Sequence, residues 1–214
     1  MKQNNPSDLN IDLGSRTEQA SLRIAQWVSR ILNPVFIVVP LYLTVALVSA
    51  SSTYEALLWW AIISLGIGIA PAVFIHRGVR QGRYTDHDIS KRDQRLVPFL
   101  FTIGCMITVL VLLLTLHVSV IILATFTGMI SSIVIALLIT HLAHWKISLH
   151  LIGITGTIVT LGLFVSPFLY YLSPIILIVG WARWRVKAHT PLQAVAGAAL
   201  AAVITVAVLR LFGL

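Results

Sequence analysis

The sequence predicts an all-α membrane protein, a polytopic bundle of six to seven transmembrane helices. Hydrophobic residues make up 58% of the 214 residues and charged residues only 10%, whereas soluble domains are about half apolar and about a quarter charged. Several apolar stretches reach the roughly 20 residues that a helix needs to cross a bilayer, and no strand pattern accompanies them. These observations exclude a soluble single domain and a disordered chain. Because Cys105 is the only cysteine, they also exclude a disulfide scaffold.

Seven apolar stretches define the predicted spans. In residue numbers they are 31–50, 56–75, 97–116, 118–141, 150–170, 174–186 and 191–212. Residues 1–30 form a polar tail without the apolar centre of a signal peptide, and residues 31–214 form the membrane domain. Within 17–31, one helical face is apolar and carries Ala20, Ile24, Trp27, Val28 and Ile31. This face fits a helix that lies on the membrane or an extension of the first span, and the sequence leaves both open.

The distribution of positive charge predicts the orientation of the chain. Lysine and arginine number 15 against seven acidic residues, which gives a net charge of +8. Fourteen of the 15 lie in the N-terminal tail, the 76–95 loop and the polar segments around 146 and 183–187, and Arg210 lies on the other side. Basic loops face the cytoplasm and attract anionic lipid. We expect an integral protein of a bacterial-type inner membrane, with membrane lipids as neighbours and no nucleic-acid partner. The sequence does not define its oligomeric state.

Three polar patches, 76–95, 144–150 and 183–193, are separated by two spans each and therefore share one side of the membrane. Together they contribute Lys91, Arg92, Arg95, Lys146, His150, Arg183, Arg185, Lys187 and His189. Guanidinium groups match phosphate oxygens, and Ser148 and His150 head an apolar helix whose free N–H groups favour an anion. Two histidines among cations suit phosphoryl transfer. The alternative is that the cations extend to lipid headgroups.

The patches resemble the three motifs of the type 2 phosphatidic acid phosphatase superfamily, K-x6-R-P, P-S-G-H and S-R-x5-H-x3-D. The third motif is matched by Arg183 and His189, which have five residues between them. The match ends at Gln193, which stands where the family has aspartate. The segment 147–150, Ile-Ser-Leu-His, resembles the second motif with leucine in place of glycine. The first motif is matched at compressed spacing by Lys91, Arg92, Arg95 and Pro98. The resemblance covers about residues 56–212.

This resemblance implies an integral membrane lipid phosphate phosphatase that needs no metal or other cofactor. His189 would attack phosphorus and form a phosphohistidine, and His150 would protonate the leaving alkoxide and then activate water. The phosphate oxygens would be bound by Lys91, Arg92, Arg95, Ser148 and Arg183. Gln193 would take the place of the acid that orients the nucleophile. The substrate would be a phosphomonoester or diphosphate on a lipid, either phosphatidate-like or prenyl.

Other functions stay open. Asp86, Asp88 and Asp93 also resemble the aspartate-rich loop of intramembrane prenyltransferases, which hold prenyl diphosphate through magnesium, although no Asp or Glu follows Asp93 to form a second loop. The departures at Leu149 and Gln193 fit a catalytically weak, phosphatase-like membrane protein. A transport or structural protein would show unchanged turnover after substitution of either histidine.

Overall fold

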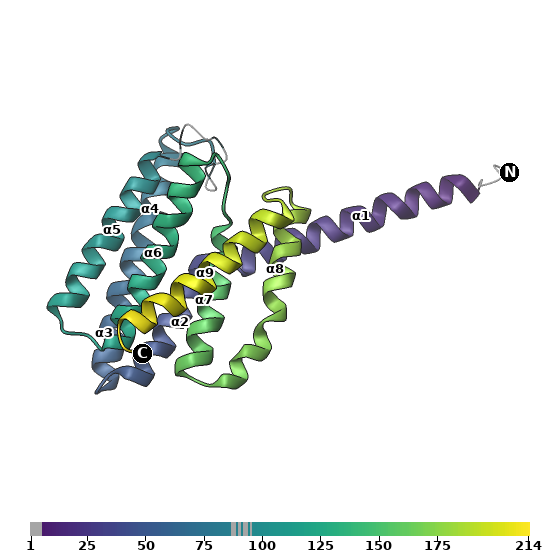
Figure 1. The fold of residues 1–214 in the computed structure, drawn as a ribbon. Helices are drawn as coiled ribbons and strands as arrows, with labels where there is room; N and C mark the ends of the chain where they lie inside the picture. Colours follow the sequence, from purple (N-terminus) through teal and green to yellow (C-terminus); the bar gives the residue numbers. More distant parts are fainter. Residues whose placement is uncertain (1–5, 87–88, 90, 92–93, 95) are drawn as a thin grey trace.

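The computed structural model describes residues 6–86, 89, 91, 94 and 96–214, and every regular element in that part of the chain is a helix (Figure 1). The helices are α1 (Pro6–Ile31), α2 (Pro34–Ser49), α3 (Thr53–Ser64), α4 (Ala70–Arg80), α5 (Leu96–Thr115), α6 (Val120–Leu142), α7 (Leu149–Phe164), α8 (Pro174–Arg185) and α9 (Pro191–Leu211). A π-helical turn, η1 (Leu65–Ile69), joins α3 to α4, and a 3-10 segment, η3 (Pro167–Leu172), lies between α7 and α8. The predicted all-α class is confirmed.

Five helical stretches of the described chain are long and apolar enough to cross a membrane. They are Arg16–Ser49, Thr53–Arg80, Leu96–Thr115, Val120–Leu142 and Pro191–Leu211. Helix α7 has 16 residues and α8 has 12. At 1.5 Å per residue these two helices span about 24 Å and about 18 Å of a hydrocarbon core roughly 30 Å thick. The predicted six to seven spans are therefore not confirmed, because apolar composition does not show where a helix ends.

The predicted span 150–170 ends early, at Phe164, for a local reason. A residue before proline is driven out of the α region, and Ser166, which precedes Pro167, has extended dihedrals of −164° and 132°. Pro174 then lies in the first turn of α8, where its missing N–H has no helical partner to lose. Helices α7 and α8 thus form a hairpin joined by the 3-10 segment. The span predicted at 56–75 differs in the other direction, since its helix continues to Arg80.

Three apolar clusters hold the described part of the bundle together, and most of their buried residues belong to two of them. Tyr42 of α2 and Phe126 of α6 are fully buried and meet edge to face, with ring centroids 5.8 Å apart, in a cluster that also includes residues of α3 and α5. Leu151 of α7, Val179 of α8 and Ala194 of α9 form the second cluster. The second cluster fixes the three helices whose polar ends carry the histidines predicted to act in catalysis.

Helix α9 approaches the start of α7 very closely at Gly197. A Cβ atom on residue 197 would lie 2.8 Å from the carbonyl oxygen of Ser148 and 3.3 Å from the Cβ of Leu151. The first distance is shorter than real Cβ atoms essentially ever show and the second is tighter than most of their contacts, so the approach requires glycine. Gly197 therefore sets the position of the segment that leads into His150.

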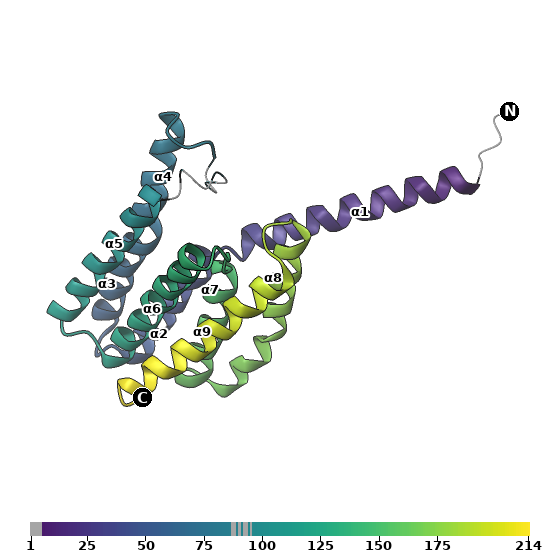
Figure 2. The same cartoon turned by 45° about the horizontal axis from the view of Figure 1, so that its top comes forward.

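The described parts of the three predicted polar patches lie at one end of the bundle. Figures 1 and 2 show the end of α4, the start of α5, the α6–α7 connection and the α8–α9 turn at that end, with the C-terminus at the opposite one. Helix α1 packs on α8 with its last turns and then projects away from the bundle. Ala25 and Ser29 of α1 are buried, whereas Ile24, Trp27 and Ile31 are 56%, 62% and 62% exposed. The apolar face noted in the sequence is therefore not the face that packs on α8.

Candidate functional site

Helix α8 ends in a tight reversal that sets the distance between Arg183 and His189. Lys187 adopts the left-handed conformation, with φ of 56°. The Ala188 N–H donates to the Arg183 carbonyl at 3.0 Å and the Lys187 N–H to the Trp184 carbonyl at 2.9 Å, which is the bonding pattern of a Schellman motif. The His189 N–H also donates to the Arg183 carbonyl, at 3.2 Å. The R-x5-H spacing therefore folds the histidine back toward the last turn of α8.

Helix α9 begins directly after His189 with a capping box. The Thr190 N–H donates to Gln193 Oε1 at 3.0 Å, and the Gln193 N–H donates to Thr190 Oγ1 at 3.3 Å. Pro191 occupies the first turn, as is common where an N–H has no helical partner. These bonds fix the backbone on the C-terminal side of His189 as firmly as the α8 reversal fixes the other side.

Ser29 of α1 connects the two sides of the site. Arg183 Nη1 donates to Ser29 Oγ at 2.6 Å, and His150 Nε2 donates to the Ser29 carbonyl oxygen at 3.2 Å. Arg183 and His189 are both near enough to His150 to act on it electrostatically. The described chain thus brings together Arg183, His150 and His189 from α8, α7 and the α8–α9 turn.

His189 is buried among positive charges. Its side chain is 8% exposed. Burial lowers the pKa of His189 to about 4, and the charges of Lys146 and Arg183 act in the same direction. The Lys146 ammonium is held nearby, where it donates to the Ala188 carbonyl at 3.5 Å. At neutral pH the imidazole is therefore uncharged and keeps a lone pair.

The predicted orienting residue, Gln193, makes the hydrogen bonds of a helix cap. Its side chain lies beside the His189 ring and favours the protonated imidazole. However, Gln193 Oε1 accepts from Thr190, and His189 Nδ1 is buried without a hydrogen-bond partner in the described chain. The T-x-x-Q pattern of residues 190–193 is a sequence signature of this cap.

The predicted phosphate-binding residues divide into three groups. Arg183 lies at the site. Ser148, which precedes α7 two residues before His150, is fully buried with an Oγ that has no hydrogen-bond partner among the described groups. Lys91 is exposed and makes no described contact with either histidine. Arg92 and Arg95 lie outside the described residues. The site in the described chain therefore rests on one arginine, with Lys146 as a second cation.

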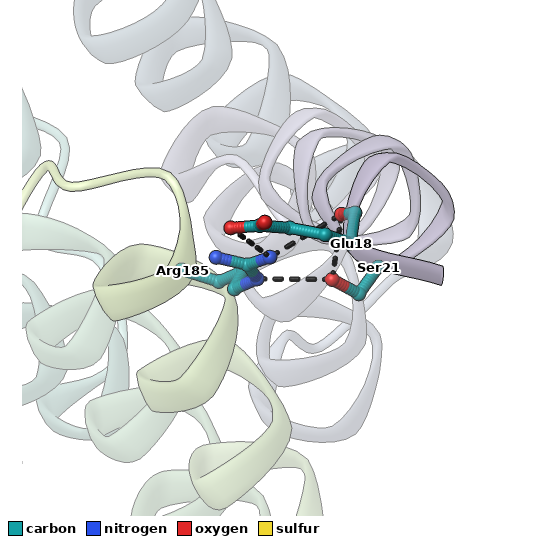
Figure 3. A network of polar contacts seen from close by, with 3 residues as sticks. All are labelled: Glu18, Ser21 and Arg185. Atoms are coloured by element: carbon teal, nitrogen blue, oxygen red, sulfur yellow. Dashed lines mark hydrogen bonds and ion pairs between the residues drawn. The ribbon is translucent and has the colours of Figure 1, made fainter. Parts of the chain in front are cut away.

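Arg185, which belongs to the same basic patch, faces α1 instead of the histidines. Its Nε donates to Ser21 Oγ at 3.0 Å, and its Nη2 lies 3.4 Å from Glu18 Oε1 (Figure 3). The same Nη2 donates to the Glu18 carbonyl at 3.2 Å. The Glu18 side chain is 73% exposed, so this ion pair contributes little to stability. Its role is to attach α1 to the end of α8.

Ser29 is the site residue that the sequence did not reveal. It lies in the tail segment, away from all three polar patches, and its hydroxyl and carbonyl both contact the site. The signal in the sequence is the pair of small residues Ala25 and Ser29, one turn apart, on a helix whose other face is apolar. Such a pair marks the face on which another helix can approach closely.

A separate cavity of about 150 Å³ lies inside the bundle, between α2, α5, α6, α7 and α9. Its wall is apolar apart from hydroxyl side chains such as Thr125 and Thr157. The residues that line it include neither His150 nor His189. The charged groups and the internal cavity therefore occupy different parts of the bundle.

Comparison with protein families, with curated proteins and with solved structures found no match to the chain in any of the three. The resemblance to the type 2 phosphatidic acid phosphatase superfamily accordingly rests on the motif residues of the sequence alone.

Proposed function

We propose that this chain is a membrane-embedded lipid phosphate phosphatase that works through a phosphohistidine intermediate. The observation that carries the proposal is the meeting of an uncharged, buried histidine, His189, with Arg183 and a second histidine, His150. A nucleophile needs a lone pair, and a phosphoryl group needs cations around its equatorial oxygens. The site offers both at one end of an apolar bundle.

In the proposed reaction, a ring nitrogen of His189 forms a bond to phosphorus while the bond from phosphorus to the lipid oxygen breaks. Burial and the charge of Arg183 lower the pKa of His150 to about 3 in the free chain, so it takes up a proton when the negatively charged phosphate binds beside it. His150 then gives this proton to the departing lipid alkoxide. A water molecule then attacks the phosphohistidine and transfers a proton to His150, and the nitrogen–phosphorus bond breaks to release inorganic phosphate. Arg183 and Lys146 stabilise the charge on the phosphoryl oxygens in both steps.

The substrate class follows from the position of the site. The histidines lie at the polar end of helices whose remaining length is apolar, so we propose a phosphate group carried by a lipid, either phosphatidate-like or prenyl. The phosphate would accept hydrogen bonds from Arg183 and His150 in place of Ser29, since both donors point at that residue. We further propose that this end faces the cytoplasm of a bacterial-type cell.

The test is phosphate release from phosphatidate and prenyl phosphates by the purified full chain, with EDTA present. His189→Ala should abolish release, and His150→Ala should lower it by about 10²–10⁴-fold, the usual contribution of a general acid and base. The matched control is His141→Ala, which removes an exposed histidine from the last turn of α6, at the same end of the bundle as the site. A lipid with a ³²P-labelled phosphate should label the wild-type protein, and the label should be lost in acid but stable in alkali. His189→Ala should not be labelled.

Two results would contradict the proposal. If His189→Ala releases phosphate at the wild-type rate, His189 is not the nucleophile, and a transport or structural role is favoured. Activity that requires magnesium and transfers the prenyl group, without release of inorganic phosphate, would favour the prenyltransferase alternative.

A further inference from the structure

A groove of about 620 Å³ lies between α4 and α5 at the same end of the bundle as the candidate site. It is separate from that site, because neither histidine nor Arg183 lines it. Its walls are apolar toward the middle of the bundle, where Ile69, Val73 and Phe101 line it, and polar at the loop end, where Arg77, Gln81 and Arg83 line it. The groove therefore has one apolar half and one cationic half.

The cationic half is built by the end of α4. Gly82 adopts the left-handed conformation, with φ of 71°. The Arg83 N–H donates to the Gly78 carbonyl at 2.9 Å and the Gly82 N–H to the Val79 carbonyl at 3.0 Å, which completes a Schellman motif. The chain is thereby turned back over the last turn of α4. This turn brings Arg83 to the same groove as Arg77.

Aromatic packing fixes the floor of the groove. Phe74 of α4 stacks on Phe101 of α5 with ring centroids 4.1 Å apart. Tyr84 lies against Phe74, with centroids 6.3 Å apart, and its ring covers Gly78 so closely that a Cβ there would overlap it. The floor is therefore rigid, and Gly78 is the residue that permits it.

The apolar half follows one line along the helix. Ile69, Val73 and Arg77 are four residues apart, so they lie on successive turns over about 12 Å. Ile69 is 54% exposed and Val73 is 43% exposed. Figures 1 and 2 show α4 and α5 side by side at the edge of the bundle. An apolar line of this kind on a membrane helix faces hydrocarbon chains.

We propose that this groove binds one anionic phospholipid, with its phosphate between Arg77 and Arg83 and an acyl chain along Ile69 and Val73. Neither guanidinium forms a hydrogen bond or ion pair with another side chain in the described chain, so both are available to the phosphate. Basic pockets at the ends of membrane helices are suited to anionic headgroups, and guanidinium groups match phosphate oxygens. Gln81 adds a neutral donor for the headgroup.

The experiment is a binding titration of the full chain in neutral detergent. Phosphatidylglycerol with a fluorescent acyl chain is the probe, and phosphatidylcholine with the same label is the reference. Phosphatidylglycerol should bind at least about tenfold more tightly. Both lipids offer a phosphate to the guanidinium groups, but phosphatidylcholine also brings a choline ammonium that the two arginines repel. Inorganic phosphate, at the ionic strength of a chloride control, should not displace it.

Three variants locate the binding. Arg77→Gln should weaken phosphatidylglycerol binding by about tenfold. Arg80→Gln, the matched control, removes an exposed arginine of the same helix end that does not line the groove, and it should leave the affinity unchanged. Val73→Trp fills the apolar half without altering any charge and should weaken binding to a similar degree as Arg77→Gln.

Three results would overturn the proposal. Equal affinity for the two lipids would show that the groove does not recognise the headgroup charge. Equal losses in Arg77→Gln and Arg80→Gln would show attraction by the overall positive charge only. Loss of binding in Arg183→Gln, which lies at the candidate catalytic site, would show that the probe binds there instead. Because phosphatidylglycerol is a phosphodiester, none of these results depends on phosphatase activity.

Discussion

The hydroxyl of Ser29 joins α1 to Arg183, and the Ser29→Ala change removes that bond alone. Arg183 Nη1 donates to Ser29 Oγ at 2.6 Å, and Ser29 is only 8% exposed. His150 contacts the backbone carbonyl of the same residue, so its bond remains. Net contributions of hydrogen bonds to charged groups are about 1.5–3 kcal/mol. We expect the free energy of unfolding to fall by about this amount.

The same change should raise the affinity for substrate. In the proposed reaction the phosphate takes the position of Ser29 Oγ on Arg183, so the hydroxyl competes with it. Removal of a competitor worth about 1.5–3 kcal/mol corresponds to a gain in affinity of about tenfold to about a hundredfold. Stability and substrate affinity should therefore change in opposite directions in Ser29→Ala.

Reversible unfolding in mixed micelles would measure the first effect, and the KM for phosphate release would measure the second. Ser21→Ala is the matched control, because it removes a hydroxyl from the same α1–α8 contact where Arg185 is partly exposed. Ser21→Ala should lower the free energy of unfolding by no more than about 1 kcal/mol and leave KM unchanged. A double-mutant cycle with Arg183→Gln isolates the pair. If the losses in free energy of unfolding of the two single variants add within about 0.5 kcal/mol in the double variant, the bond does not contribute the predicted stability.

Two further substitutions test the helix ends that carry the site. Gln193→Glu keeps a capping box and adds a carboxylate beside His189, so the pKa of His189 should rise from about 4 toward its ordinary value. The acid limb of the pH profile for phosphoenzyme formation should then move to higher pH, whereas a purely capping role for residue 193 would leave it in place. Gly197→Ala should destabilise the chain by about 1–3 kcal/mol and slow phosphate release, because the new Cβ meets the Ser148 carbonyl. Gly180→Ala is its control, since a Cβ there lies 3.9 Å from its nearest neighbour, and a stability equal in the two variants would contradict the close approach.

The sequence predicts the class of this fold well and its helix ends less well. Apolar composition is enough to identify the long helices, since a buried backbone in lipid must be helical. The early end of α7 depends on Ser166 and Pro167, and the continuation of α4 to Arg80 depends on a reversal at Gly82. Both are local backbone effects inside or beside apolar stretches. Hydropathy does not report them.

The candidate site was predictable where it lies close in sequence to a helix end. Only five residues separate Arg183 from His189, and the parity of the spans brings His150 to the same end. Ser29 was not predictable, because its contact with Arg183 depends on where α1 crosses α8, across more than 150 residues of sequence. Contacts of that separation require the packing of the whole bundle.

Gln193 stands where the superfamily that the sequence resembles has an aspartate, and this difference bears on the proposed reaction. An acid beside a nucleophilic histidine orients the ring and stabilises its charged form. Here burial and two cations keep His189 uncharged at neutral pH, so the lone pair is available without deprotonation. Among the glutamates that the structure describes, Glu18 pairs with Arg185 and Glu55 caps α3, so neither lies beside the positively charged phosphohistidine. In the proposed reaction the attack is therefore favoured by Arg183 and Lys146 binding the phosphoryl oxygens. With Gln193 instead of an acid beside the ring, the intermediate should be short-lived and open to water.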